Sequence, residues 1–263
     1  VNDKVPLELH ASLQHPGLVT GMAWSNDDDG SLLATCSSFG VVRIWETQSW
    51  TQVQEIRDAS EQFIEEFYWV RFTPDNMHLV VGGKQKNRAE WDMEDDDNAI
   101  VPCIGKVFDV VSGKLVATLE GHQEEITDLK VVSFRGEPVL VTCSQDGYIF
   151  KWTMNETFTE VVGRARVLDE TTDMVVHLAF VPGTGNQYFV AATNNDFKLF
   201  DLEHMRLVKV FDSPYSSYGD FCEFVPNCSE VVAADSVGKA SARPVHYLLT
   251  RGVELLTPGG VPP

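Results

Sequence analysis

Short apolar segments recur along this chain, and polar turns separate them. LVTGMAW and LLATCSSFGVVRIW lie near the amino terminus, and LVATLE, ITDLKVV, PVLVTC and YIFKW follow near the middle. Runs of this length, bounded by glycine, asparagine, aspartate or proline, are typical of β-strands. Many such strands at near-regular spacing predict an all-β repeat fold.

The clearest repeating unit spans residues 115–152. One strand leads into a Gly-His pair, an apolar strand follows, the next strand ends in VTCS, and an Asp-Gly turn precedes a strand that ends in tryptophan. This order resembles that of a WD40 repeat. The resemblance rests on four positions: His122, Thr142, Asp146 and Trp152. It implies a WD40 β-propeller, a rigid fold that usually binds other proteins and is seldom an enzyme.

These four side chains can satisfy one another's hydrogen bonds. Asp146, in an Asp-Gly turn of the kind that closes tight hairpins, can accept from the His122 ring. The ring can reach the Thr142 hydroxyl, which can accept from the indole N–H of Trp152. Because buried polar groups need partners, we interpret the set as a structural tetrad and assign no catalytic residues.

Sliding this register along the chain reveals four weaker copies. In the first copy, His15, Thr35 and Trp45 stand at the histidine, threonine and tryptophan positions, whereas Phe39 replaces the aspartate. A later copy has Asn194 at the turn and Phe200-Asp201 at the strand end. The last copy, through FCEFV, SEVVAAD and KASARPV, is the poorest match.

The prediction is therefore a single WD40 propeller domain over residues 1–263 with five visible repeats. The expected blades are 14–60, 61–119, 120–166, 167–212 and 213–257. Their innermost strands are predicted at Thr20–Trp24, Trp69–Phe72, Thr127–Val132, Val175–Phe180 and Phe221–Phe224.

The second repeat contains the literal Trp91-Asp92, but this pair does not end its third strand. KQKNRAEW is too polar for a packed strand, whereas IGKVFD followed by the turn VVSGK fits. Trp91 then lies in an acidic insertion, residues 84–103. Hairpin loops usually have about two to five residues, so a longer one is more often functional or disordered than neutral.

Five repeats are fewer than the seven with which most WD40 propellers close. Leu7–Leu13 resembles an outer strand that could pair with region 230–256 to close the ring and cover an open sheet edge. Alternatively, two blades lie outside this chain, which we favour slightly. The chain starts without an initiator methionine, which indicates an internal fragment.

The five cysteines form no CxxC pair and indicate no disulfide framework. Cys36 and Cys143 occupy the same position in two repeats and are expected to be small buried residues. Cys222 and Cys228 have the wrong spacing for a zinc knuckle, so no metal or other cofactor is predicted. This cysteine usage and the lack of a long apolar run favour the cytoplasm or nucleus and no membrane contact.

The net charge of −19 predicts repulsion of nucleic acid backbones and anionic membranes. Partners are therefore expected to be proteins with basic segments, such as a histone tail or another subunit of a complex. The short acidic groups Asp27–Asp29 and Glu65-Glu66 are interpreted as solvated loops.

The insertion is the main candidate contact because its loop type usually lies on the partner-binding face and it combines acids with a tryptophan. The predicted partner-binding residues are Trp91, Asp92, Glu94, Asp95, Asp96, Asp97, Phe39, Tyr148 and Tyr215.

The function expected from the resemblance is a non-catalytic scaffold in a multiprotein complex, nuclear or chromatin-associated. Two alternatives are kept. Some WD40 substrate receptors of ubiquitin ligases carry a WDxR motif, but the arginine is absent after Trp45, Trp91 and Trp152. A propeller hydrolase gathers carboxylates and a metal near the central channel, and no repeated His/Asp cluster or serine nucleophile motif indicates one.

Overall fold

The computed structural model describes residues 8–58, 64–86, 103–167, 173–212, 219–224, 230–235 and 240–244. Strands, turns and irregular segments account for all of these residues, and none of them is helical. The chain divides into two compact units. Unit 1 comprises residues 1–121 and 158–160, and unit 2 comprises residues 122–157 and 161–263.

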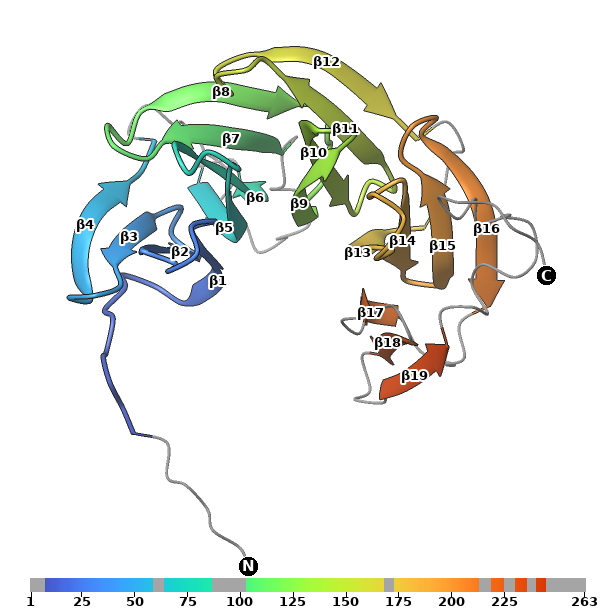
Figure 1. Ribbon diagram of the computed structural model, residues 1–263, viewed down its shortest axis with the longest axis horizontal. Coiled ribbons are helices and arrows are strands. Elements are labelled where there is room, and N and C mark those ends of the chain that lie inside the picture. Colours follow the sequence, from blue (N-terminus) through green and yellow to red (C-terminus); the bar gives the residue numbers. More distant parts are fainter. Residues whose placement is uncertain are drawn as a thin grey trace, which may run out of the picture. The chain divides into compact units, whose positions relative to one another are not determined.

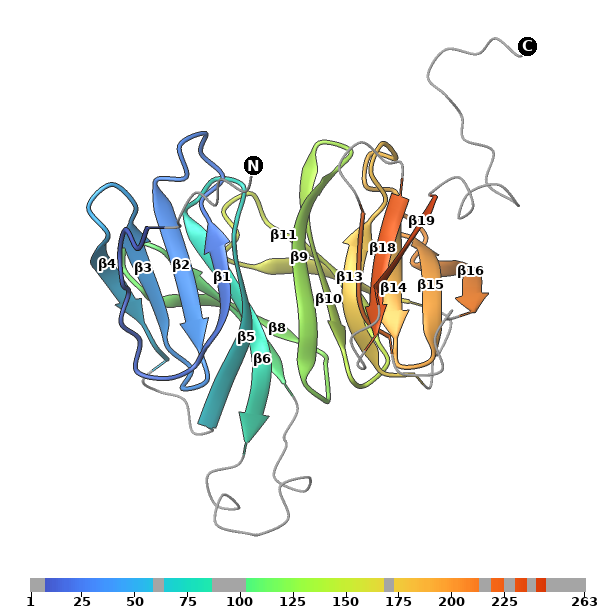
Figure 2. The same ribbon diagram turned by 90° about the horizontal axis from the view of Figure 1, so that it is seen from below.

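Unit 1 contains two four-stranded antiparallel sheets in which neighbouring strands follow chain order (Figure 1). The first sheet comprises β1 (Val19–Trp24), β2 (Leu32–Ser37), β3 (Val42–Glu46) and β4 (Thr51–Ile56). The second comprises β5 (Ile64–Phe72), β6 (His78–Lys86), β7 (Ile104–Asp109) and β8 (Leu115–Glu120). Figure 2 shows β1 and β5, the first strands of the two sheets, side by side.

Unit 2 repeats this pattern. Its sheets are also antiparallel and also follow chain order. The first comprises β9 (Ile126–Phe134), β10 (Glu137–Ser144), β11 (Ile149–Met154) and β12 (Val161–Arg166). The second comprises β13 (Val175–Phe180), β14 (Tyr188–Thr193), β15 (Asp196–Asp201) and β16 (Arg206–Asp212). Within the described residues, the last sheet has three strands: β17 (Gly219–Phe224), β18 (Glu230–Asp235) and β19 (Ala240–Pro244).

The all-β prediction is confirmed, and each predicted innermost strand lies in the first strand of a sheet: β1, β5, β9, β13 or β17. The predicted outer strand at Leu7–Leu13 is not found, because residues 8–13 are irregular and pair with no strand of the described chain. A strand at an edge exists only where a neighbour supplies hydrogen bonds to its backbone.

The third strand of the second sheet is β7, as the polarity of KQKNRAEW predicts. β6 pairs with β7 from His78↔Asp109 to Val81↔Lys106, and β7 pairs with β8. The segment between β6 and β7 includes Trp91, which lies outside the described residues together with the rest of 87–102.

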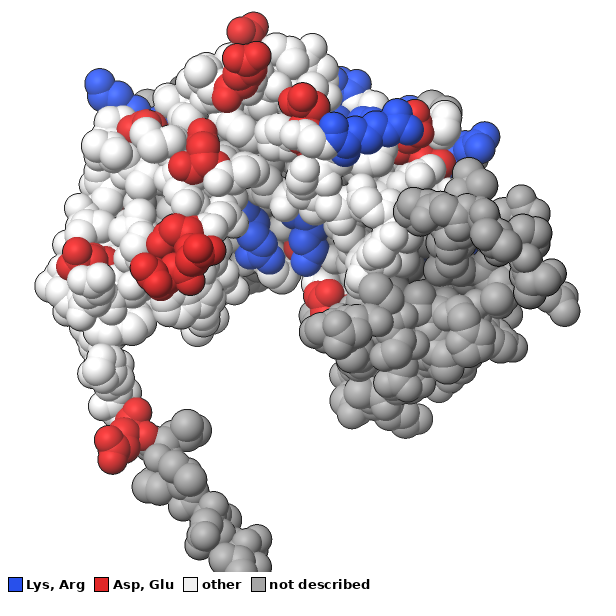
Figure 3. Space-filling view, viewed as in Figure 1, with Lys and Arg blue, Asp and Glu red and all other residues white. Residues whose placement is uncertain are grey.

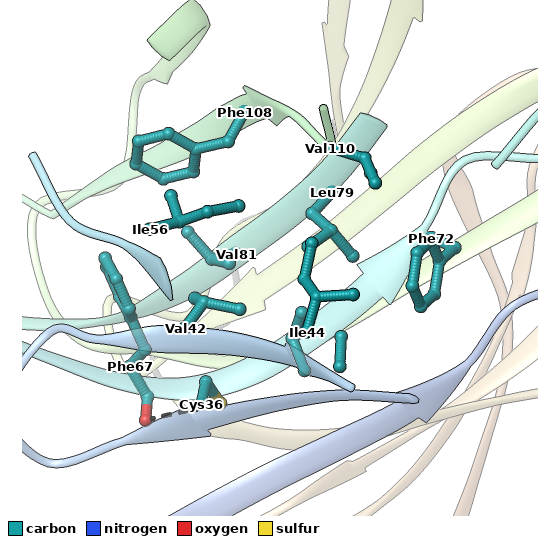
Figure 4. Close-up of a cluster of buried hydrophobic side chains, with 12 residues drawn as sticks. Cys36, Val42, Ile44, Ile56, Phe67, Phe72, Leu79, Val81, Phe108 and Val110 are labelled. Atoms are coloured by element: carbon teal, nitrogen blue, oxygen red, sulfur yellow. Dashed lines mark hydrogen bonds between the residues drawn. The ribbon is translucent and has the colours of Figure 1, made fainter. Parts of the chain in front are cut away.

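The core of unit 1 is formed by the facing surfaces of its two sheets (Figure 4). Alternate residues of each strand point to the same side, so Val42 and Ile44 meet Leu79 and Val81. All four are fully buried. Unit 2 has the same arrangement, in which the β9–β12 and β13–β16 sheets share one cluster.

A threonine near the start of the first strand links neighbouring sheets within each unit. The Thr20 hydroxyl donates to the Phe67 carbonyl, and the Thr127 hydroxyl donates to the Val175 carbonyl at 2.6 Å. Cys36 and Cys143 lie beside these threonines, with sulfur–oxygen distances of 3.6 and 3.4 Å. Burial raises the pKa of Cys36 to about 11 and also raises that of Cys143. Both thiols are therefore buried packing groups of low reactivity.

Candidate functional site

The predicted tetrad residues lie in one continuous hydrogen-bonded chain in unit 2. The Trp152 indole N–H donates to the Thr142 hydroxyl oxygen at 2.9 Å. That hydroxyl lies 2.8 Å from His122 Nε2, and His122 Nδ1 lies 3.1 Å from Asp146 Oδ2. One tautomer satisfies every contact, with Thr142 donating to Nε2 and Nδ1–H donating to Asp146. Each polar side chain of this network therefore has a partner within it.

The local sequence positions Asp146 for this role. Gly147, at a φ of 79°, permits the tight turn between β10 and β11. The turn directs the carboxylate inward, where it also accepts from the backbone N–H groups of Gln123 and Tyr148 at 2.8 and 2.9 Å. Burial acts to raise the pKa of Asp146, but these hydrogen bonds, led by that from His122, outweigh it and lower the pKa.

This depressed pKa makes the contribution of Asp146 to stability depend on pH. The ionised carboxylate stabilises the fold above its unfolded-state pKa, near 3.8, and the contribution is lost as pH falls through the lower folded-state value. Asp146→Asn should therefore unfold at lower urea than the parent at neutral pH, and the gap should shrink below pH 3.8. Asp28→Asn, in an exposed turn, is the control and should show little gap. A gap for Asp146→Asn that stays constant down to about pH 2.5 would contradict this account.

The first repeat retains only part of the network. The Trp45 indole donates to the Thr35 hydroxyl at 2.9 Å, as in the third repeat. His15 Nε2, however, lies 3.4 Å from the Thr35 carbonyl oxygen, and the buried His15 Nδ1 has no hydrogen-bond partner. The missing partner is explained by Phe39, which stands at the aspartate position and cannot accept a hydrogen bond.

A buried trio that sequence reasoning missed joins three strands of unit 2. Asp128 of β9 lies 3.5 Å from His177 of β13, and His177 lies 4.0 Å from the Cys222 sulfur of β17. Read as acid, base and nucleophile, the trio resembles a catalytic set. Burial raises the pKa of Cys222 and lowers that of His177, which disfavours the thiolate and imidazolium forms. Asp128 also accepts from the Leu178 amide at 2.9 Å, so the trio links strands.

A second buried cluster corrects the interpretation of Glu65 as a solvated acid. Glu65 is buried at the start of β5, with its carboxylate 2.6 Å from Lys106 of β7. Asp58 lies 2.9 Å from the same ammonium, and the buried Gln85 side chain lies 3.4 Å from Glu65. Lys106 is 2% exposed. These residues hold the adjoining ends of β6 and β7, from which segment 87–102 extends.

The sequence carries a signal for this cluster. Arg43, Lys106 and Lys198 each stand two residues before the aromatic residue of a third strand. Arg43 pairs with Glu55 at 2.8 Å, and the buried Lys198 pairs with Asp173. A basic residue inside an otherwise apolar strand therefore indicates a carboxylate beside it, since a buried charge needs a partner.

Of the predicted partner-binding residues, the structure describes only Phe39 and Tyr148. Phe39 lies in the β2–β3 turn and is 59% exposed. Tyr148 follows the β10–β11 turn, partly exposed, and the Arg166 guanidinium lies 4.5 Å from its ring centre. The remaining predicted contacts lie outside the described residues: Trp91, Asp92, Glu94, Asp95, Asp96, Asp97 and Tyr215.

Acidic side chains of the described residues form several separate groups on the face that Figure 3 presents. One acidic group, Asp27–Asp29, lies in the β1–β2 turn, as predicted. A carboxylate oxygen of Asp27 accepts from the Ser31 amide at 2.7 Å, and hydrogen bonds from Ser25 and Ser31 lower the pKa of Asp27 to about 2. This acid therefore orders the turn that carries it. Asp28 and Asp29 are exposed.

Neither a metal-binding cluster nor a membrane-spanning helix occurs among the described residues. They contain no cluster of three or more histidine, cysteine, aspartate or glutamate side chains arranged to hold a metal ion. No helix with the length and apolarity to cross a membrane occurs in this part of the chain.

Repeated four-stranded antiparallel sheets and the buried His–Thr–Asp–Trp network define a repeat protein with propeller-type blades. Two segments, residues 7–46 and 113–153, match the family model of the WD domain, G-beta repeat. Both matched segments are WD40 repeats, and the comparisons identify no particular member of that family. WD40 repeats form scaffolds that bind other proteins and are generally non-catalytic.

Two curated relatives resemble part of the chain. The nuclear distribution protein nudF of Aspergillus niger is 30% identical over 118 residues, which cover 45% of this chain and 26% of that protein. The WD repeat-containing protein GTS1 of Arabidopsis thaliana is 30% identical over 138 residues, covering 51% of this chain and 30% of that protein. The matches thus span less than a third of either relative.

Proposed function

We propose that this chain is a non-catalytic subunit of a multiprotein complex and binds a basic segment of a partner protein. The observation that carries the proposal is charge: the chain has a net charge of −19 and places a run of acids in the segment between β6 and β7. A partner rich in lysine and arginine would be steered toward such a surface.

The position of the acidic segment supports this proposal. Its two ends continue β6 and β7, and the buried Lys106 of β7 pairs with Glu65 of β5 and with Asp58. Gln85 and Cys103, close to the two ends, are also buried. The strands on either side of the segment are therefore anchored by buried polar contacts.

Aromatic side chains that are at least partly exposed are further candidate contacts, each within its own unit. Phe39 and Tyr148 belong to turns between second and third strands, the same type of connection as segment 87–102. Trp91 stands within the acidic run. Aromatic residues are enriched among the side chains that contribute most to binding, so Trp91 is proposed as an anchor and the acids as its charged rim.

The proposed partners are a histone tail or a basic segment of another subunit, in the nucleus or cytoplasm. The acidity of the chain favours these over nucleic acid, whose phosphates it would repel. Binding a chromatin component would make the protein chromatin-associated.

The test uses a fluorescently labelled lysine- and arginine-rich histone-tail peptide and measures its affinity at several salt concentrations. Replacing residues 87–102 by a short Gly/Ser linker should weaken binding at least about tenfold. Gln85 and Cys103 are retained because both are buried. Trp91→Ala should weaken binding at every salt concentration, because the loss of a buried contact mainly raises the dissociation rate.

A charge-matched pair of variants separates a specific rim from general acidity. Asp96 and Asp97→Asn and the control Asp28 and Asp29→Asn each remove two negative charges. The first should weaken binding several-fold at low salt and little at high salt, whereas the control should leave it nearly unchanged. Equal effects of the two variants, or no effect of the linker replacement, would overturn the proposal.

A further inference from the structure

The outermost strand of the first sheet of unit 2 carries two arginines on one face, in a chain whose net charge is −19. Arg164 and Arg166 of β12 pair with Trp152 and Phe150 of β11, so no irregularity separates them and their side chains leave the strand on the same side. Both arginines are exposed. The equivalent strands β4 and β8 contain neither lysine nor arginine.

Aromatic rings hold both guanidinium groups in place. The Arg164 guanidinium lies 5.2 Å from the ring centre of Phe150 and 5.9 Å from that of Trp152. The Arg166 guanidinium lies 4.5 Å from the ring centre of Tyr148. A guanidinium over a ring face is attracted by the ring and keeps its positive charge. A ligand that binds these groups therefore has less side-chain freedom to restrict.

The backbone of the same two residues is open to pairing. β12 ends its sheet, and among the described strands only β11 pairs with it (Figure 1). The Val167 N–H donates to the Ile149 carbonyl at 3.0 Å and so points toward β11. Because the direction of backbone groups alternates along a strand, the N–H and carbonyl groups of Arg166 and Arg164 point away from β11.

We propose that β12 binds an extended acidic segment of a partner protein, which pairs antiparallel with the open edge and places two carboxylates on Arg164 and Arg166. Residues that face each other across an antiparallel pair project from the same side, so acids two positions apart in the partner match the two arginines. Each arginine can bind a carboxylate through two parallel hydrogen bonds. The backbone hydrogen bonds supply affinity and the carboxylates supply specificity.

A protein strand is favoured over nucleic acid for two reasons. The open edge offers backbone donors and acceptors at the spacing of another strand. A long polyanion would also be repelled by a chain of net charge −19. This surface takes the chemistry opposite to that of the basic segment proposed for the acidic insertion, so the two sites can be tested independently.

The first measurement uses a fluorescently labelled peptide, Thr-Val-Glu-Val-Glu-Val-Thr, and residues 1–263. Combining Arg164→Gln with Arg166→Gln should weaken binding by about tenfold or more, because two charged hydrogen-bond partners are lost. The control combines Arg135→Gln with Arg206→Gln, which removes two positive charges from exposed positions of unit 2. The control should leave binding nearly unchanged, and thermal unfolding checks that both variants are folded. Equal effects of the two variants, or no binding to the parent chain, would overturn the proposal.

The second measurement tests pairing with the edge by changing the peptide. Glutamates opposite Arg164 and Arg166 would point their N–H groups at β12, so N-methylation of both glutamates should abolish binding. N-methylation of two valines is the matched control and should have little effect. An isomer with adjacent glutamates, Thr-Val-Glu-Glu-Val-Val-Thr, has the same charge and should bind about tenfold more weakly.

Equal binding of all four peptides would show that charge alone attracts them and would overturn the proposal. A single-stranded oligonucleotide that binds more tightly than the first peptide, and loses binding in the variant of Arg164 and Arg166, would assign the surface to nucleic acid and also overturn it.

Discussion

Replacing Lys106 by methionine is expected to lower the free energy of unfolding of unit 1 by about 3–5 kcal/mol. Methionine fills a similar volume, so packing changes little. The loss is electrostatic, because the Asp58 and Glu65 carboxylates, 2.9 and 2.6 Å from the ammonium, would remain without their cation. Their side chains are only 10% and 5% exposed, so hydration would compensate little for the loss of the ammonium.

Urea unfolding of the parent and of two control variants measures this effect. Lys114→Met, on an exposed turn, should change the free energy of unfolding by no more than about 0.5 kcal/mol. Combining Lys106→Met with Asp58→Asn and Glu65→Gln should recover part of the loss, because the two side chains that face position 106 are then uncharged. If Lys106→Met unfolds at the same urea concentration as Lys114→Met, the ion pairs contribute nothing.

His122→Ala is expected to destabilise unit 2 by about 1–3 kcal/mol without abolishing a chemical activity. The substitution removes the partner of Thr142 on one side and of Asp146 on the other, and both are enclosed by the fold. It also removes the ring that packs edge-on against Phe150, with centres 4.8 Å apart. The buried network loses its central member.

The matched control is His15→Ala, which should cost clearly less. His15 makes one long contact to the Thr35 carbonyl, and its Nδ1 has no partner to lose. Urea denaturation measures the unfolding midpoint of each variant, and the two shifts from the parent are compared. Equal shifts would contradict the view that the aspartate in the turn makes the network strong.

The all-β fold was readable from the chain because strands impose local patterns. Alternating apolar residues and turn residues such as Asp146-Gly147 depend only on neighbours along the sequence. The same reasoning placed β7 at IGKVFD and brought His122, Thr142, Asp146 and Trp152 together, since the repeat fixes their register. The predicted strand at Leu7–Leu13 was wrong because an edge strand depends on a neighbour that local pattern cannot supply.

The burial of charged side chains depended on contacts between distant segments. Glu65 reads as a solvated acid beside Glu66, yet β5 places it against Lys106, 41 positions further along the chain. The trio of Asp128, His177 and Cys222 likewise comes from three strands with no common sequence motif. The sequence by itself determined the repeat, its strands and its tetrad, because these follow from local periodicity. Only the tertiary structure decided which polar groups are buried and paired, because that depends on which strands pack side by side.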